Sequence, residues 1–128
     1  MKDLSMAVVV KQGKVLVQNR YRRGKGMVFE FPGGSVDSGE SGEQAAIREL
    51  WEETGLNGLK VLGNHTAQNS YGGEISYVVS EALPNQEPAA VDLERKQTFY
   101  WFIPTDIPRG DFFDADLAFI EKPLGLYT

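Results

Sequence analysis

The sequence predicts one domain in which helices pack on a mixed β-sheet, as an α+β fold or an α/β/α sandwich. Short apolar segments rich in β-branched residues alternate with Gly and Pro turn signals along most of the chain. A long amphipathic helix is predicted near the middle and a second helix near the C-terminus. The length of 128 residues, without an internal repeat or linker, predicts a single domain over residues 1–128.

The first predicted strands lie before the central helix. An apolar strand over 5–10 and its partner over 15–17 flank a Gly-containing turn, which predicts a hairpin. A basic, Gly-containing loop is expected over 20–26, and a short strand over 28–31 ends at Pro32.

The central helix has clear boundary signals. Ser41 with Gln44 three residues on is a capping-box pattern, and Gly55 is the expected C-cap of a helix that ends at about Thr54. The later elements are strands over 59–62, 75–79 and 98–103, a turn at 71–73, a loop at 84–88, and a helix over 111–121 with Leu117 and Ile120 inward and Pro123 beyond its end.

Composition excludes several classes of function. The chain has no cysteine, which excludes disulfides, a thiol nucleophile and thiolate zinc sites. His65 is the single histidine, and a lone imidazole argues against a metal site built on it. No apolar segment reaches membrane-spanning length, and the first residues do not resemble a signal peptide, so a cytoplasmic protein without a membrane partner is expected.

The net charge of −5 is unevenly distributed. Residues 37–53 contain six acids and one base, and the rest of the chain is neutral. An acidic chain argues against a nucleic-acid partner. A cluster of bases lies just upstream, at Arg20, Arg22, Arg23 and Lys25.

The acids of the central helix share a face. At about 100° per residue, Glu49, Glu52 and Glu53 fall within roughly 100° of one another. The opposite face is expected to pack on the sheet and contains Ala46, Ile47, Leu50, Trp51 and Thr54. Because like charges one turn apart repel, a hard cation such as Mg²⁺ would stabilise this face. The alternative is a solvated acidic surface.

The spacing of these residues resembles a known motif. From Gly34 to Leu56 the chain matches all nine specified positions of the Nudix box, G-x5-E-x7-R-E-U-x-E-E-x-G-U, where U is aliphatic. The preceding residues 30–34, Glu-Phe-Pro-Gly-Gly, resemble the MutT branch of that superfamily. The chain is therefore similar to Nudix hydrolases, and the resemblance implies a Nudix α/β/α sandwich around a mixed β-sheet.

The resemblance also implies a reaction and its residues. Members hydrolyse a nucleoside diphosphate linked to another moiety with Mg²⁺, and Mn²⁺ is the alternative metal. Glu49, Glu52 and Glu53 would bind the metal, together with the carbonyl of Gly33. Arg48 would orient a glutamate, most often its neighbour Glu49. Glu40 would anchor the loop or a metal-bound water.

The general base is less defined by the motif. A carboxylate that accepts a proton from metal-bound water suits in-line attack at phosphorus. Glu49 is the first choice. Glu94 is the second candidate for the general base and a candidate for a further metal ligand. The alternative interpretation of Glu94 is an exposed charge without a role in the site. Asp92 and Glu87 compete for the same role.

Substrate-binding residues are expected outside the box. Arg20, Arg22, Arg23 and Lys25 could bind phosphates or form a solvated loop. Tyr71 could stack on a base or flank a hairpin turn. Asp116, like Asp114, could accept hydrogen bonds from a purine edge or favour a helix N-terminus.

These features favour a MutT-like nucleoside triphosphate pyrophosphohydrolase, including one for oxidised nucleotides. The alternatives are a dinucleoside polyphosphate, nucleotide-sugar or ADP-ribose hydrolase, and a non-catalytic nucleotide-sensing domain. The expected partner is a small nucleotide substrate. A homodimer is possible through residues 5–10 or 101–103.

Overall fold

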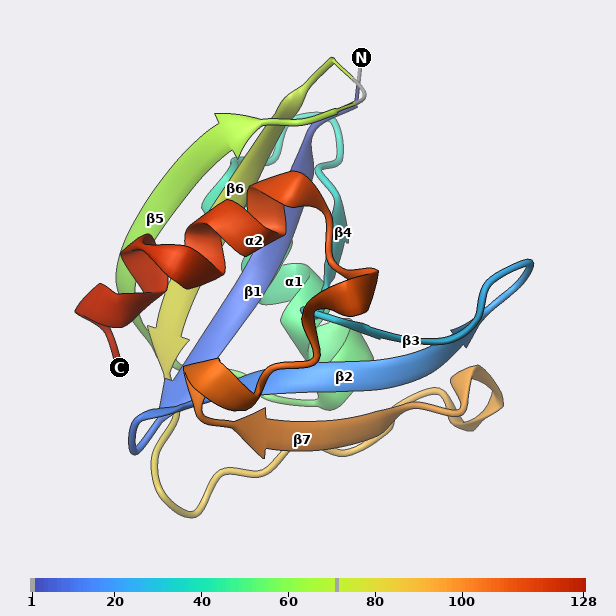
Figure 1. Ribbon diagram of the computed structural model, residues 1–128, viewed down its shortest axis with the longest axis vertical. Helices are drawn as coiled ribbons and strands as arrows, with labels where there is room; N and C mark the ends of the chain where they lie inside the picture. The colour runs from blue at the N-terminus through green and yellow to red at the C-terminus, as the bar shows by residue number, and fades with distance from the viewer. Residues whose placement is uncertain (1, 71) are drawn as a thin grey trace.

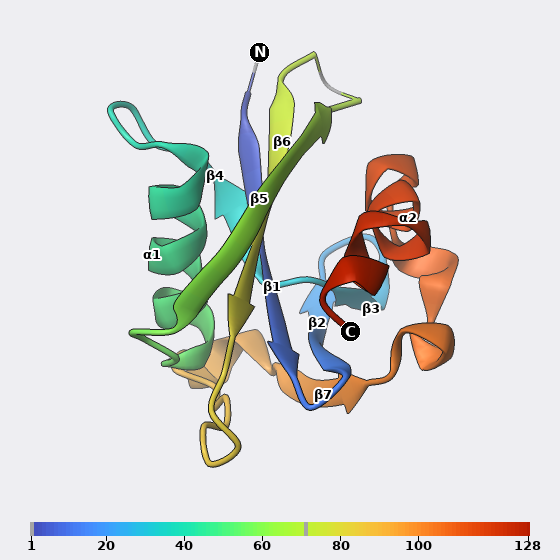
Figure 2. The ribbon, with the colours of Figure 1, turned by 90° about the vertical axis from the view of Figure 1, so that its left-hand side faces the viewer.

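The computed structural model describes residues 2–70 and 72–128, so the prediction for Tyr71 lies outside the described residues. Figure 2 shows a β-sheet layer between two helical layers, which confirms the predicted sandwich. The strands are β1 Leu4–Lys11, β2 Lys14–Arg22, β3 Gly26–Glu30, β4 Gly33–Ser35, β5 Lys60–Gln68, β6 Glu74–Glu81 and β7 Thr98–Phe102. The helices are α1 Gly42–Thr54 and α2 Asp114–Glu121, and short 3-10 turns cover Leu93–Arg95, Pro104–Asp106, Arg109–Asp111 and Pro123–Leu126.

Strand β1 is the centre of a mixed sheet with the order β3-β2-β1-β6-β5. It pairs parallel with β6 and antiparallel with both β2 and β4. Strand β7 is added antiparallel to β2. Because β2 meets β1 only near the β1–β2 turn, it runs away from β1 together with β3 and β7, as Figure 1 shows. The free side of β1 is where β4 pairs, next to α1.

Alternation along β1 divides the core between the two helical layers. Ala7 and Val9 pack with Ala46 and Leu50 of α1. Val8 and Val10 face the opposite side, where Phe119 of α2 joins the core. These residues are at most 5% exposed, so the sheet is dry on both faces and holds α1 and β4 rigidly together.

Helix α1 has the predicted ends. The Ser41 hydroxyl accepts from the Gln44 amide N–H at 3.1 Å, and the Gln44 side chain accepts from the Ser41 N–H at 2.9 Å. Gly55 ends the helix in the left-handed conformation at φ 76° and donates to the Trp51 carbonyl at 3.0 Å. The capping box and the C-cap are confirmed.

The predicted packing face of α1 is partly wrong. Ile47 and Trp51 are 42% and 57% exposed, whereas Glu53 is only 1% exposed. The helix is rotated so that Ala45 and Ala46 approach the sheet, because small side chains allow the closest contact with β1. One of the three carboxylates predicted to share the acidic face is therefore inside the protein.

Strand lengths differ from the predictions where pairing is long-range. The expected basic loop over 20–26 is wrong at both ends, because β2 continues to Arg22 and β3 begins at Gly26. The strand expected over 59–62 continues to Gln68, since β6 offers a partner along that whole length. The segment Gly33–Ser35 is a short strand, and α2 begins at Asp114 after a separate 3-10 turn.

The two helices α1 and α2 contain 13 and 8 residues. Within residues 2–70 and 72–128, no helix combines the length and the apolar character needed to cross a membrane.

Candidate active site

Strand β4 and helix α1 place a glycine turn against the helical carboxylates. A β-carbon at Gly34 would lie 2.7 Å from the nearest Glu49 carboxylate oxygen. The amide N–H of Gly33 donates to Glu53 Oε2 at 3.0 Å. A residue larger than glycine at position 34 would therefore displace the Glu49 carboxylate, which explains why the turn needs this residue.

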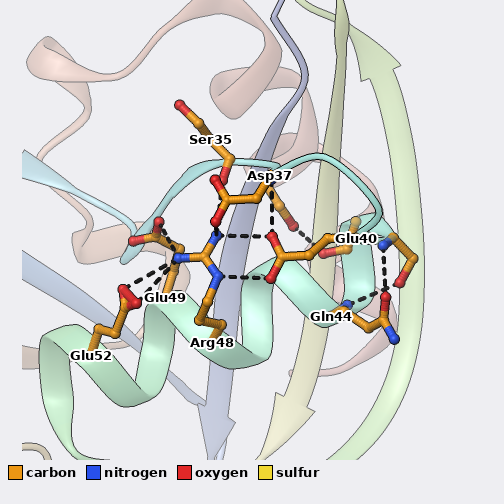
Figure 3. Close-up of polar contacts among 10 residues, drawn as sticks. Ser35, Asp37, Glu40, Gln44, Arg48, Glu49 and Glu52 are labelled. Carbon is orange, nitrogen blue, oxygen red and sulfur yellow. Dashed lines mark hydrogen bonds and ion pairs between the residues drawn. The ribbon is translucent and has the colours of Figure 1, made fainter.

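Arg48 is the hub of the box, as Figure 3 shows. Its guanidinium donates twice to Glu40, at 2.7 and 2.9 Å, and once to Glu49 at 3.0 Å. It also donates to Glu52 at 3.2 Å and to the Ser35 carbonyl at 3.1 Å. One cation thus ties the 35–40 loop to α1 and partly offsets the repulsion among the helical acids.

The contacts of Arg48 set the protonation of its neighbours. The hydrogen bonds from Arg48 are the main reason that the pKa of Glu40 is lowered to about 2. The same contacts with Glu40 raise the pKa of Arg48. Both groups are therefore charged at any pH of interest, and the loop stays anchored.

Glu53 lies in a different environment. Its side chain has no exposed surface and accepts from Gln18 Nε2 at 3.0 Å in addition to Gly33. Burial raises the pKa of Glu53 to about 7, and the nearby charge of Glu49 acts in the same direction, although the Gln18 hydrogen bond opposes both. A buried carboxylate next to a second one is a place where a cation would be stabilising.

A cleft of about 630 Å³ opens beside the glycine turn, on the α2 side of β4. It is lined by Gly33 and Gly34, by Arg22, Lys25 and Glu30 of the β2–β3 hairpin, and by Gly110, Asp111, Phe113 and Asp116 near α2. The cleft therefore lies between the glycine turn that contacts the α1 carboxylates, the basic side chains of the β2–β3 hairpin and the start of α2. This is the arrangement that a polyphosphate with an attached group requires.

The predicted phosphate-binding arginines have different positions. Arg22 forms a bidentate pair with Glu30, at 2.9 and 3.0 Å, in the cleft. Arg20 is largely buried, with Nη1 3.9 Å from Glu53 Oε1 and Nε 3.4 Å from Glu30 Oε1. Arg23 is exposed in the β2–β3 turn. Only Arg22 and Lys25 of the predicted basic group line the cleft.

Asp116 is buried at the inner end of the cleft. It accepts from the Tyr77 hydroxyl at 2.6 Å and from the Phe113 amide N–H at 3.1 Å. Burial raises the pKa of Asp116, against the effect of these two hydrogen bonds. Burial, followed by the Asp116 charge, raises the pKa of Tyr77. Asp114, in contrast, is exposed.

The candidates for an additional carboxylate are dispersed. Glu94 is exposed on the Leu93–Arg95 turn and lines a separate hollow of about 440 Å³ with Arg20 and Lys96. Asp92 accepts from the Glu94 amide N–H, and Glu87 is bound by Lys11 and by the Trp101 indole. Of the three, Glu94 alone shares a hollow with Arg20, which approaches Glu53.

Sequence reasoning missed the contacts of two buried glutamines, Gln18 and Gln97, and the place of Glu30 beside them. Gln18 lies between Glu53 and Glu30, and Gln97 donates to Gln18 at 3.0 Å. No local pattern marks these residues, since the two glutamines are 79 positions apart and meet through the β2–β7 pairing. The single histidine, His65, lies with its Nε2 2.6 Å from the Tyr127 hydroxyl.

The carboxylates are close to, but not already in, a coordination geometry. Within residues 2–70 and 72–128, no group of three or more acidic, histidine or cysteine side chains converges on one cation position. The donor set is nevertheless all oxygen, which suits Mg²⁺. Glu53 accepts from the Gly33 amide and Gly34 closely approaches the Glu49 carboxylate, so oxygen donors gather at the glycine turn and fit a hard cation.

The fold and this site together define a class of protein: a mixed-sheet α/β/α domain with a carboxylate-rich helix below a glycine turn. The chain belongs to the NUDIX domain family, whose model matches residues 1–122. The family match, together with relatives named as pyrophosphohydrolases and a pyrophosphatase, identifies the chain as a Nudix hydrolase. Members of this family generally use a divalent metal such as Mg²⁺.

Two relatives illustrate the range of similarity. The CTP pyrophosphohydrolase of Escherichia coli (strain K12) is 26% identical over 127 residues, covering 97% of this chain and 92% of that protein. An RNA pyrophosphohydrolase of Tolumonas auensis is 33% identical over 101 residues, covering 79% of this chain. The match covers only 53% of that protein, so this chain spans about half the length of such relatives.

Solved structures agree with the fold. The Escherichia coli ORF135 protein has a TM-score of 0.70 and 25% identity, with 100% of this chain and 91% of that chain covered. The MutT NUDIX hydrolase from Burkholderia pseudomallei has a TM-score of 0.67 and 27% identity, with 94% and 95% covered. A Caenorhabditis elegans Ap4A hydrolase reaches 0.78 at 16% identity over 99% and 98%, which shows the fold alone.

Proposed function

We propose that this protein is a Mg²⁺-dependent pyrophosphohydrolase of nucleoside diphosphate-linked compounds and that nucleoside triphosphates are its substrates. The observation that carries the proposal is that the same glycine turn contacts the α1 carboxylates and lines the cleft. Gly33 and Gly34 contact the Glu53 and Glu49 carboxylates, and the same two glycines line the cleft that holds Arg22. A phosphate chain in the cleft would therefore reach the carboxylates.

The metal would be held by oxygen ligands from two elements. Glu49, Glu52 and Glu53 of α1 and the carbonyl of Gly33 supply them, with Mn²⁺ as a functional substitute. Glu94 is proposed as a further ligand or as the second candidate for the base. When bound, the metal lowers the pKa of a water molecule and neutralises charge on the phosphates.

Side chains of the protein would bind the phosphates and accept the proton of the attacking water. Arg22 and Lys25 bind phosphate oxygens in the cleft, with Arg20 and Arg23 as additional candidates. Glu49 accepts the proton of the attacking water, because its carboxylate is aligned by Arg48 and is only partly buried. Arg48 itself maintains the loop and does not meet the substrate.

The start of α2 would bind the nucleobase of the substrate. Asp116 presents acceptor oxygens at the inner end of the cleft, and Phe113 offers an apolar ring beside it. The relative of similar length, covered to 92%, is named a CTP pyrophosphohydrolase, which supports nucleoside triphosphates over larger substrates. The retained carboxylates argue against the alternative of a non-catalytic nucleotide-sensing domain.

The test is a phosphate- and pyrophosphate-release screen with Mg²⁺. The substrates are nucleoside triphosphates, their oxidised forms, dinucleoside polyphosphates, ADP-ribose and nucleotide sugars, each with wild type and with Glu49→Gln. We expect turnover of one or more triphosphates that is lost in EDTA, restored by excess Mg²⁺, and reduced at least about 100-fold in the variant. EDTA-insensitive hydrolysis, or preference for a dinucleotide or sugar nucleotide, would refute the proposal.

A further inference from the structure

Gln18 connects three elements from the middle of β2. Its side chain is fully buried, although an amide with four hydrogen-bonding positions is costly to bury. The Nε2 group donates to Glu53 Oε1 of α1 at 3.0 Å and to Glu30 Oε1 of β3 at 3.2 Å. The Oε1 atom accepts from Gln97 Nε2, just before β7, at 3.0 Å. The amide thus has a partner for each N–H and for its oxygen.

These contacts define how the Glu53 carboxylate is oriented. One of its oxygens accepts from Gln18 and the other from the Gly33 amide, both at 3.0 Å. Two donors from different strands, one on each oxygen, determine both the position and the plane of a carboxylate. The guanidinium of Arg20 is farther away, at 3.9 Å, and cannot replace the Gln18 hydrogen bond.

Gln97 determines which way the Gln18 amide points. A rotated amide would place the Gln18 oxygen against Glu53, where two acceptors repel each other, and its N–H₂ against the N–H₂ of Gln97. The Gln97 oxygen is buried and has no hydrogen-bond partner within the described residues. Burying an unpaired acceptor is unfavourable, and in this arrangement it accompanies the hydrogen bond from Gln97 Nε2 to Gln18.

We propose that Gln18 is the positioning residue of Glu53 and that Gln97 acts on Glu53 only through Gln18. The proposal rests on the proposed function in one respect, which is that Glu53 binds the metal. Gln18 orients Glu53 without neutralising it, because an amide has no charge. Gln97 also follows the turn that holds Glu94, so the path Gln97–Gln18–Glu53 links that turn to the carboxylate cluster.

The experiment is a double-mutant cycle with Gln18→Leu, Gln97→Leu and the double variant. Gln68→Leu is the matched control, since Gln68 is an exposed strand residue at the end of β5, away from the site. The first readout is Mn²⁺ binding to the metal-free protein by calorimetry and by the electron paramagnetic resonance of free Mn²⁺. The second is turnover of the best nucleotide as a function of metal concentration.

We expect Gln18→Leu to weaken Mn²⁺ binding and to raise the metal concentration at half-maximal turnover by about 10–100-fold, the usual effect of losing a partner of a metal ligand. Gln97→Leu alone should weaken binding several-fold. In the Gln18→Leu background it should have no further effect, because its route to Glu53 is already absent. The control should match wild type.

The following results would decide against the proposal or against the proposed function on which it rests. Mn²⁺ affinity within twofold of wild type in Gln18→Leu would remove the positioning role, and equal effects of Gln97→Leu in both backgrounds would show independent action. A wild type that binds no Mn²⁺ would refute the proposed function as well, whereas a wild type that binds Mn²⁺ without nucleotide turnover would refute that function alone. If circular dichroism shows Gln18→Leu to be unfolded, unchanged Mn²⁺ affinity in folded Gln97→Leu is the refuting result.

Discussion

Gly34→Ala is the sharpest perturbation of the cluster because its geometric effect can be worked out. The new β-carbon would lie 2.7 Å from Glu49 Oε1 and 2.8 Å from Glu49 Cδ, where ordinary contacts begin at 3.4 Å. The carboxylate must therefore move by about 0.7 Å. A misplacement of about 1 Å in a catalytic group can reduce the rate on the order of 100-fold.

The backbone itself should tolerate this change. Gly34 is not among the glycines with positive φ, and the group it would meet is the end of a side chain. Unfolding free energy should therefore change by less than about 1 kcal/mol. We expect kcat with Mg²⁺ to fall by about 10–100-fold while the urea unfolding midpoint stays near that of wild type.

The assay is steady-state hydrolysis of the best nucleotide, with urea unfolding in parallel. Gly125→Ala is the matched control, because an added β-carbon there meets nothing within 4 Å. Wild-type kcat in Gly34→Ala would show that the contact between the glycine turn and Glu49 does not determine catalysis, and the reasoning would fail.

Three further outcomes are expected. Glu52→Gln should lower Mg²⁺-dependent kcat at least about 100-fold with an unchanged circular dichroism spectrum, since Glu52 is half exposed; turnover equal to wild type would remove it from the metal site. The folded-state pKa of Glu53 is raised to about 7, so in metal-free protein the protonated side chain contributes its full stability below pH 4.5, and this contribution is lost as pH rises through 7. The unfolding free energy, measured by urea unfolding at each pH, should therefore fall by about 1–3 kcal/mol over that range. A Glu53→Gln variant with the same pH slope as wild type would contradict this. Asp116→Asn should destabilise the protein by about 1 kcal/mol, because one of its two accepting oxygens becomes a donor facing Tyr77 or Phe113, and an unshifted melting temperature would argue against that pairing.

Local signals in the sequence predicted α1 correctly at both ends and identified Arg48 with its neighbouring acids. They succeeded because caps and one-turn spacings depend on residues close in the chain. The error concerned rotation. The arithmetic grouped Glu53 with Glu49 and Glu52, but around the helix axis Glu53 is only about 20° from Ala46, and the sheet packs on that side. Apolar character alone assigned Trp51 to the core, whereas the small alanines determine which side of α1 approaches β1.

Long-range pairing explains what the sequence did not predict. Arg20 and Arg22 were expected in a loop, yet β3 pairs with β2 along these residues and extends it through them, while β7 pairs with the earlier part of β2 up to Asn19. The Gln97–Gln18–Glu53 chain likewise needs β7 next to β2 and α1 below both. Neither register is encoded in a pattern of neighbouring residues, so the inner side of the carboxylate cluster became visible only in three dimensions.

The distribution of donors around the acids suggests why two kinds of contact coexist in one site. Arg48 neutralises the acids that anchor the loop, and it contacts Glu40, Glu49 and Glu52 but not Glu53. Glu53 meets the neutral amides of Gln18 and Gly33 at 3.0 Å, and the guanidinium of Arg20 lies farther away, with Nη1 3.9 Å from Glu53 Oε1. A lysine at position 18 would hold the carboxylate as firmly but would cancel the charge that attracts a cation. The two donors at 3.0 Å from Glu53 are neutral and orient it, and Arg20 at 3.9 Å offsets its charge less than a cation in direct contact would, which suits a metal ligand.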